Sequence, residues 1–304
     1  MQVLNLLVSL ITEDNDFQME QAATAQATAH RLGVQVKIVY AANDAVLQNQ
    51  QLFTAIQKPE ARPDGILVEP VGTGMVQAAS AAVSAGIAWG VINRDVDYVA
   101  RLRRGRSTTV FSVATDHAEV GRIQGAQLAA LVSEGGILYI EGPSSGGVAR
   151  ARSAGMLSVV GRGIAVKVLK GDWTEQSGYH AAKSWLSLST ARQMDIRALA
   201  AHNDAMAIGA RRAFEEVADL NARREWLKLP FLGCDGVPKA GREWVRRGLL
   251  RATVVTPPPM GVALEIMVHA IRSGVQPPEF TISQPSSFPP VKELTEAAMA
   301  QKAH

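Results

Sequence analysis

Short runs of hydrophobic residues alternate with longer stretches of mixed polarity along nearly the whole chain. The runs have the length of buried strands and the stretches between them have the length of helices, a pattern typical of βαβ units. Such units build parallel sheets that are covered by helices on both faces. The predicted strands are Val3–Leu10, Val34–Tyr40, Gly65–Val68, Ala88–Ile92, Val110–Val113, Gly136–Ile140, Ala165–Leu169, Ala198–Ala201, Phe231–Gly233 and Ala252–Val255.

Capping residues support the same alternation. The helices predicted between the strands include Gln18–Leu32, Met75–Ala85, His117–Val132, Ala205–Val217 and Pro238–Arg247. Gly33 follows the first of them as an expected C-cap, and Asp116 precedes the third as an expected N-cap. Gly121 and Gly125 lie inside that third helix, where we expect them to allow close packing.

The number of strands favours two sheets, and the length of 304 residues is sufficient for two domains. We therefore predict an α/β fold of two Rossmann-like lobes with parallel sheets covered by helices. Prolines gather late in the chain, in "TPPPMG" (256–261), "QPPEF" (276–280) and "QPSSFPP" (284–290). Because proline disrupts strand pairing, we expect crossing segments and a surface tail there rather than strands.

The composition excludes several classes of protein. The longest hydrophobic runs are only as long as strands, so the sequence predicts no membrane span and no membrane insertion. Cys234 is the sole cysteine, which excludes an internal disulfide and a thiolate metal cluster. The net charge of +3 comes with arginines that are scattered in small groups, a pattern typical of solvated surfaces, and we expect no nucleic acid partner.

The N-terminus bears on the compartment. Met1 is followed at once by the strand pattern "VLNLLVSL", without a basic segment or a cleavage site before it. Two alternatives stay open at this point. The protein is periplasmic or lies in the cell envelope if a signal peptide has been removed, and it is cytoplasmic if there was none.

Catalytic and cofactor motifs are scarce. "GPSSG" (142–146) fits the G-x-S-x-G pattern of hydrolases and would make Ser144 a nucleophile, which we keep as a distant alternative. The sequence has no P-loop, no dinucleotide fingerprint after the first strand and no histidine pair with metal-ligand spacing. We therefore expect neither a cofactor nor a metal.

Polar and aromatic residues follow the predicted strands at their carboxyl ends, where open α/β sheets bind ligands. Amides, carboxylates and guanidinium groups bind pairs of hydroxyl groups, and aromatic rings pack on the C–H faces of a sugar. This mixture predicts a site for a sugar or related polyol. The candidate residues are Asn15, Phe17, Gln18, Asn93, Arg94, Arg152, Trp173, Asn203, Asp235 and Thr256.

Purely structural interpretations compete with this one. Asn15, Asn203 and Asp235 also suit helix caps or turns, since each follows a predicted strand. Phe17 also suits packing of the first helix on the sheet, Trp173 suits packing at the surface of a lobe, and Arg152 suits an exposed helix position. Glu69 ends a strand as well, and the sequence leaves open whether it faces a ligand.

Four longer segments are typical of one protein family: "HNDAMAIGA" (202–210), "LGCDGVPKAGREWVRRGLLRATV" (232–254), "VATDHAEVGRIQGAQLA" (113–129) and "ARARSAGM" (149–156). "ITEDNDFQ" (11–18) and "VINRDV" (91–96) lie in register with them. With these segments the chain resembles the type I periplasmic sugar-binding proteins, which include ribose- and galactose-binding proteins and share their fold with the ligand-binding core of lactose-repressor-type regulators. The resemblance covers about residues 3–290.

The resemblance implies a role for each candidate. Asn15, Asn203 and Asp235 would bind hydroxyl groups, and Phe17 and Trp173 would stack on opposite faces of the ring. Arg94 and Arg152 would reach the ligand from different lobes. Gln18 stands where some members have a second aromatic residue, Asn93 where many have Asp or Asn, and Thr256 where members usually have Gln or Asn.

The resemblance also implies an architecture and a function. Lobe 1 would comprise 3–113 plus 257–281 and lobe 2 would comprise 114–254 plus 284–304, joined by a hinge of three crossings near Thr115, Val255 and Ser283. We expect a monomeric solute-binding protein, not an enzyme, that captures a monosaccharide or polyol between the lobes and delivers it to an ABC permease. The alternative is a sugar-sensing module of the same fold that acts in signalling, for example through a sensor kinase, or in transcription.

Overall fold

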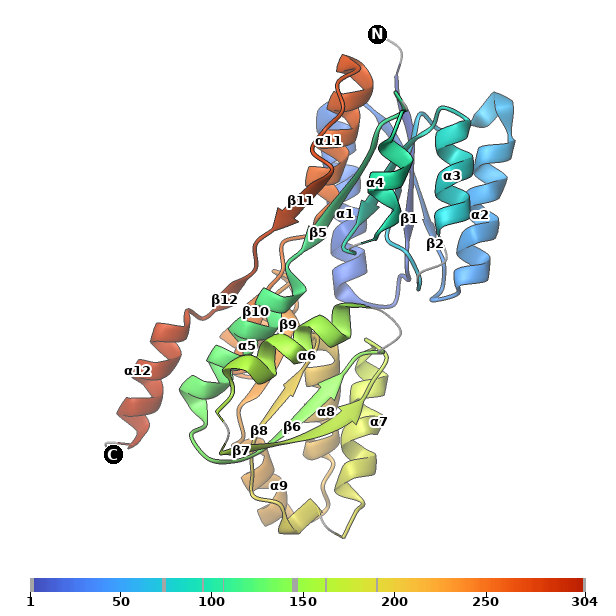
Figure 1. Cartoon of the computed structure of the whole chain (residues 1–304). Helices are drawn as coiled ribbons and strands as arrows, with labels where there is room; N and C mark the ends of the chain where they lie inside the picture. The colour runs from blue at the N-terminus through green and yellow to red at the C-terminus, as the bar shows by residue number, and fades with distance from the viewer. Residues whose placement is uncertain are drawn as a thin grey trace. The chain divides into compact units, whose positions relative to one another are not determined.

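The computed structural model describes residues 3–72, 75–94, 96–105, 107–143, 147–161, 163–189 and 191–302 (Figure 1). The chain divides into two compact units. Unit 1 comprises Met1–Thr115 and Pro258–Ser283, and unit 2 comprises Asp116–Pro257 and Gln284–His304. Each unit contains one six-stranded sheet with helices on both faces, which confirms the predicted α/β fold.

In unit 1 the strand order is β11-β5-β4-β3-β1-β2, and every neighbouring pair is parallel. The strands are β1 (Asn5–Leu10), β2 (Gln35–Tyr40), β3 (Gly65–Val68), β4 (Ala88–Ile92), β5 (Val110–Thr115) and β11 (Phe280–Ser283). The helices are α1 (Asp16–Leu32), α2 (Ala45–Gln57), α3 (Val76–Ser84), α4 (Tyr98–Arg103) and α11 (Met260–Ser273), with a 3-10 turn η1 (Pro59–Ala61).

The side chains of β1 alternate between two cores. Leu6 and Val8 pack in the core beneath α1 and α11, whereas Leu7 packs on the opposite face, beneath α2 and α3. Figure 1 shows α2 and α3 side by side over that second face. Because both faces of the strand are buried, it reads in the sequence as a continuous hydrophobic run.

Unit 2 repeats this topology with the order β12-β10-β9-β8-β6-β7. Its strands are β6 (Gly135–Glu141), β7 (Ile164–Lys170), β8 (Ile196–Ala201), β9 (Phe231–Asp235), β10 (Ala252–Val255) and β12 (Ser286–Phe288). Its helices are α5 (His117–Leu131), α6 (Gly147–Val159), α7 (Glu175–Leu186), α8 (Asp204–Glu215), α9 (Leu220–Leu227), α10 (Gly241–Arg246) and α12 (Val291–Lys302), with a 3-10 turn η2 (Ala191–Gln193).

Three local predictions are confirmed. Gly33 ends α1 in the left-handed conformation, with φ of 63°. Asp116 caps α5, and its side chain accepts a hydrogen bond from the backbone N–H of Glu119. Gly121 lies so close to α6 that a Cβ atom there would be 2.0 Å from the carbonyl oxygen of Arg152.

The expectation for the proline-rich C-terminal segments is wrong in three respects. Phe280, the last residue of "QPPEF", begins β11, which pairs parallel with β5. Ser286–Phe288 forms β12, which pairs antiparallel with β10. Proline is tolerated because Pro285 and Pro289 flank the strand and β12 lies at the edge of its sheet, where one side of the backbone needs no partner. The segment after it is not a surface tail, since it forms α12 and buries Leu294 in the core of unit 2.

The described helices contain no segment with the length and hydrophobicity needed to span a bilayer.

Candidate functional site

The predicted site residues fall into two sets, one at the carboxyl edge of each sheet. Unit 1 carries Asn15, Phe17 and Gln18 at the start of α1, after β1, and Asn93 and Arg94 after β4. Unit 2 carries Arg152 in α6, Trp173 after β7, Asn203 after β8, Asp235 at the end of β9 and Thr256 after β10. Several of the strands that precede these residues are adjacent in the sheets, so several members of each set are neighbours.

Glu69 is the centre of the set in unit 1. Its carboxylate is 2 % exposed and accepts hydrogen bonds from Gln18 Nε2 at 2.9 Å, Asn93 Nδ2 at 2.8 Å and Gln21 Nε2 at 3.5 Å. A buried carboxylate is costly without such partners, and three amide donors satisfy it here. Because Asn93 Nδ2 is bound to Glu69, the orientation of the Asn93 amide is fixed.

Arg94 is the cation of this set. Burial lowers the pKa of its guanidinium from the ordinary value, and the charge of Glu69 opposes that shift. Its Nε atom is buried and has no hydrogen-bond partner among the described residues. A buried donor without a partner costs free energy, which favours a ligand oxygen at this position.

The other three residues of unit 1 have structural roles as well. Asn15 caps α1 and accepts the N–H of Gln18 at 2.9 Å. Phe17 is buried in the first turn of that helix, with 7 % of its surface exposed. Gln18 uses both ends of its amide within the protein, since its Oε1 also accepts the N–H of Ile11 at 3.3 Å. Contact of Gln18 with a ligand therefore stays a prediction, and its observed role is to hold Glu69.

Arg152 is the centre of the set in unit 2. It is 4 % exposed and donates from Nη1 to the carbonyl oxygen of His202. Its Nη2 lies 3.5 Å from Asp235 Oδ1, and its guanidinium lies 5.7 Å from the centre of the Trp173 ring. Arg152, Trp173 and Asp235 are therefore neighbours in space, although they are far apart in the sequence.

Asn203 and Thr256 complete this set. Asn203 caps α8 by accepting the N–H of Met206 at 2.9 Å, and its Nδ2 donates to the carbonyl oxygen of Trp173 at 2.8 Å. The capping interpretation of Asn203 is therefore confirmed, and the second hydrogen on Nδ2 is left for another acceptor. Thr256 is 2 % exposed and donates through Oγ1 to the carbonyl oxygen of Asp235 at 3.4 Å, so its contact with a ligand stays a prediction.

Backbone strain coincides with the predicted site. Five non-glycine residues of the described chain have positive φ, and three of them are Asn93 (58°), Trp173 (75°) and Asp235 (98°). Such conformations cost about 1–3 kcal/mol each, and they cluster at functional sites in proteins. This observation points to the same residues as the sequence did, by an independent route.

The turn after Asp235 is held by a second carboxylate. Asp204 Oδ2 accepts the N–H of Gly236 at 2.7 Å and is 4 % exposed. A Cβ atom at Gly233 would be 2.1 Å from Asp204 Oδ1, and one at Gly241 would be 1.9 Å from Asp204 Oδ2. Asp204 therefore positions the backbone that presents Asp235.

His202 is a site residue whose role the sequence did not reveal. Its buried ring accepts the N–H of Gly142 at Nδ1 over 3.1 Å, and its Nε2 lies 3.0 Å from the hydroxyl oxygen of Tyr139. The ring stacks on Trp173 with 5.8 Å between their centres. His202 thus packs against the Trp173 ring and holds it in place. The position of His202 in "HND", between a strand and a helix, is the one feature of the sequence that points to this role.

We expect His202 to make unit 2 less stable in acid. Burial first, and then the charge of Arg152, hold the pKa of His202 well below the ordinary histidine value of 6.5. As the pH falls through that value, the unfolded chain takes up a proton and the folded chain does not, so the free energy of unfolding decreases. Between pH 6.5 and about pH 5.5 the loss is bounded by about 1.4 kcal/mol, the value for one proton per pH unit.

Urea unfolding at a series of pH values tests this expectation. His202→Asn keeps a hydrogen-bond acceptor near Gly142 but does not titrate, so its free energy of unfolding should fall less than that of the wild type over this pH range. Equal slopes for the two proteins would show that His202 does not cause the loss.

Two other predictions concern chemistry. No group of three or more His, Cys, Asp and Glu side chains with metal-ligand geometry occurs among the described residues. Ser144, the candidate nucleophile of the distant hydrolase alternative, lies outside the described residues.

Comparison with known proteins identifies the family. Residues 6–274 match the model of the periplasmic binding protein domain, which is most of the chain. The chain belongs to the periplasmic binding protein domain family. The resemblance inferred from its sequence is therefore confirmed.

Relatives and structural neighbours of this periplasmic binding protein are named as binding proteins for a sugar or inositol, or have one bound. The D-apiose import binding protein of Paraburkholderia graminis is 24% identical over 98% of this chain and 88% of its own. An ABC transporter periplasmic solute binding protein of Actinobacillus succinogenes with bound D-allose superposes with a TM-score of 0.81 at 21% identity, covering 96% of this chain and 99% of that one. The Caulobacter myo-inositol binding protein with myo-inositol superposes with a TM-score of 0.80 at 20% identity, covering 96% and 95%.

Proposed function

We propose that this protein binds a monosaccharide or related polyol with residues from both units and delivers it to an ABC importer. The observation that carries the proposal is the cluster of Arg152, Trp173, Asn203 and Asp235 at the carboxyl edge of one sheet. It combines a guanidinium group, a carboxylate, an amide and an aromatic face, the groups that recognise the hydroxyls and C–H faces of a sugar.

The charges of the two sets favour an uncharged ligand. Glu69 and Arg94 interact electrostatically in unit 1, and Arg152 pairs with Asp235 in unit 2. Each set thus has one cation and one anion among these residues, so an anionic ligand would gain no unbalanced cation. A neutral polyol suits both sets, because each charged group can bind a hydroxyl and keep its partner.

The names of the relatives support this class of ligand and the role in import. D-Apiose appears in the name of a relative, and D-allose and myo-inositol are bound in structural neighbours. All three are uncharged polyols. We place the protein in the cell envelope on the same grounds, as the binding component that an ABC permease receives, without catalysis of its own.

A melting-temperature screen tests the proposed function. We expect at least one of D-apiose, D-allose, D-ribose and myo-inositol to stabilise the protein by about 2.7 kcal/mol at a concentration of about 100 times its Kd. For a chain of this size that corresponds to a shift of about 5 °C. D-Glucuronate is the charged control and should shift the melting temperature less. If no neutral polyol changes the melting temperature, the proposed function is wrong.

A further inference from the structure

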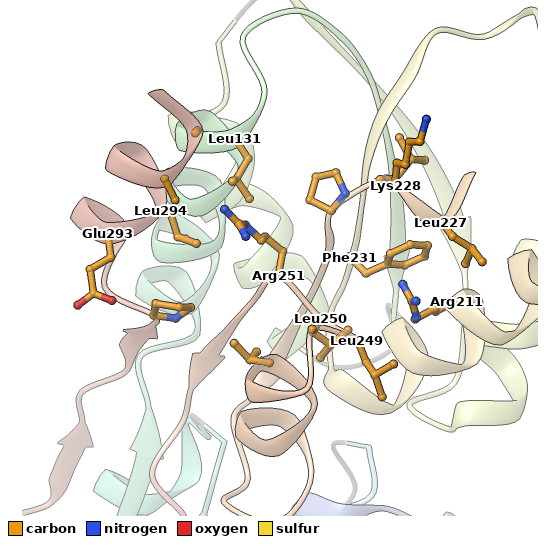
Figure 2. A pocket seen from close by; sticks show the side chains of 17 residues that line it. Leu131, Arg211, Leu227, Lys228, Phe231, Leu249, Leu250, Arg251, Glu293 and Leu294 are labelled. Atoms are coloured by element: carbon orange, nitrogen blue, oxygen red, sulfur yellow. The ribbon is translucent and has the colours of Figure 1, made fainter. Parts of the chain in front are cut away.

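A cavity of about 570 Å³ lies in unit 2 at the amino-terminal ends of β9 and β10 (Figure 2). Residues of α5, α8, α9, α10 and α12 line it, together with the loops before the two strands. The volume falls within the range of small-molecule sites. The predicted polyol residues of unit 2 lie at the other edge of this sheet, about 13 Å away along the five residues of β9.

The walls of the cavity are hydrophobic over about half of their surface and polar over the rest. Leu131 from α5 and Leu294 from α12 line one side, and Phe231 at the start of β9 lines the other. Phe231 and Leu294 are 1 % and 2 % exposed and belong to the cores of the unit, so they back the cavity. The half-buried Leu131 and Leu249, in contrast, present accessible apolar surface. Such walls suit a hydrocarbon group.

Three cationic residues line the cavity, and two of them have acidic partners. Arg211 lies 3.2 Å from Glu215 and stacks over the Phe231 ring at 5.4 Å. Lys228 lies 2.7 Å from Glu225. Neither residue contributes an unbalanced charge to the cavity.

Arg251 is the exception. Within the described part of the chain, no hydrogen bond or ion pair reaches its guanidinium group, which Figure 2 shows extended between Leu294 and Phe231. The one carboxylate that lines the cavity, Glu293, is exposed on α12 and points away from Arg251. A planar guanidinium among hydrophobic walls is the complement of a carboxylate that carries an apolar body.

We propose that this cavity is a second ligand site, separate from the polyol residues, for a small amphipathic carboxylate. The carboxylate pairs with Arg251, and its hydrocarbon part packs on the half-buried Leu131 and Leu249. The proposal does not depend on the proposed function, since it uses none of the polyol residues.

Saturation-transfer difference NMR with sodium octanoate tests this site in the whole chain. The wild type should bind octanoate, and Arg251→Gln should weaken that binding at least tenfold. Arg251→Lys keeps the charge without the planar fork and should give an intermediate affinity. Arg247→Gln is the matched control, because Arg247 is exposed nearby on the loop after α10 and does not line the cavity.

Two comparisons separate the proposal from simple hydrophobic binding. 1-Octanol has a chain of the same length without the charge and should bind at least tenfold more weakly than octanoate. All variants should keep the wild-type melting temperature and the wild-type response to polyols. The proposal is overturned if octanoate does not bind, if Arg251→Gln binds it as tightly as the wild type, or if octanol binds equally well.

Discussion

Arg152→Met is expected to abolish measurable polyol binding and to lower the free energy of unfolding by about 3 kcal/mol. The substitution keeps most of the side-chain volume but removes the charge that pairs with Asp235 and the donor to the carbonyl oxygen of His202. Both partners then stay largely buried without their cation, which is the costly outcome for a buried pair. The loss of binding should be at least about 100-fold, because charged hydrogen bonds contribute about 1.5–3 kcal/mol each.

Urea unfolding and calorimetry with a polyol from the melting screen measure the two effects of Arg152→Met. Arg150→Met is the matched control, since Arg150 is exposed on the same helix two residues away. It should change the free energy of unfolding by less than about 0.5 kcal/mol and leave binding intact. If the two variants behave alike, Arg152 does not organise the set in unit 2.

Gly121→Ala is expected to destabilise the protein by about 3 kcal/mol, against the preference of helices for alanine. Alanine would gain about 1 kcal/mol in helix propensity. A Cβ atom at Gly121, however, would lie 2.0 Å from the carbonyl oxygen of Arg152, so α5 and α6 have to separate. Since that carbonyl belongs to Arg152 itself, the shift should also weaken polyol binding.

Gly147→Ala serves as the control for this prediction. Gly147 begins α6, and no described residue outside its own helix turn lies within 4 Å of a Cβ built there. Alanine at this position should be neutral or slightly stabilising in urea unfolding. If Gly121→Ala is as stable as Gly147→Ala, the close approach of the two helices is not required.

The fold was largely predictable because both faces of its central strands are buried. The hydrophobic runs of β1, β3, β4 and β8 stand out from the polar helix surfaces, and the caps Gly33 and Asp116 mark helix ends directly. The edge strand β12 escaped prediction because it is short, half-exposed and flanked by prolines, so it has no hydrophobic pattern.

The sequence placed the candidate residues at strand ends, but it did not show the hydrogen bonds among them. The polar residues after each strand could be found in the sequence, because the predicted strands gave the positions of the strand ends. The role of Glu69 depends on β3 lying between β1 and β4, which brings the carboxylate between Gln18 and Asn93. Strand order is set by the packing of the whole unit, and neither it nor the strained backbone of Trp173 and Asp235 has a local signal in the sequence.

The central claim is that one polyol is bound by residues of both units. Titration calorimetry of the wild type, Arg94→Met and Asp235→Asn, with a polyol found in the melting screen, tests it most directly. The account predicts one ligand per chain and at least tenfold weaker binding for each variant, although the two substitutions lie in different units. Two ligands per chain, or wild-type affinity in either variant, would contradict it.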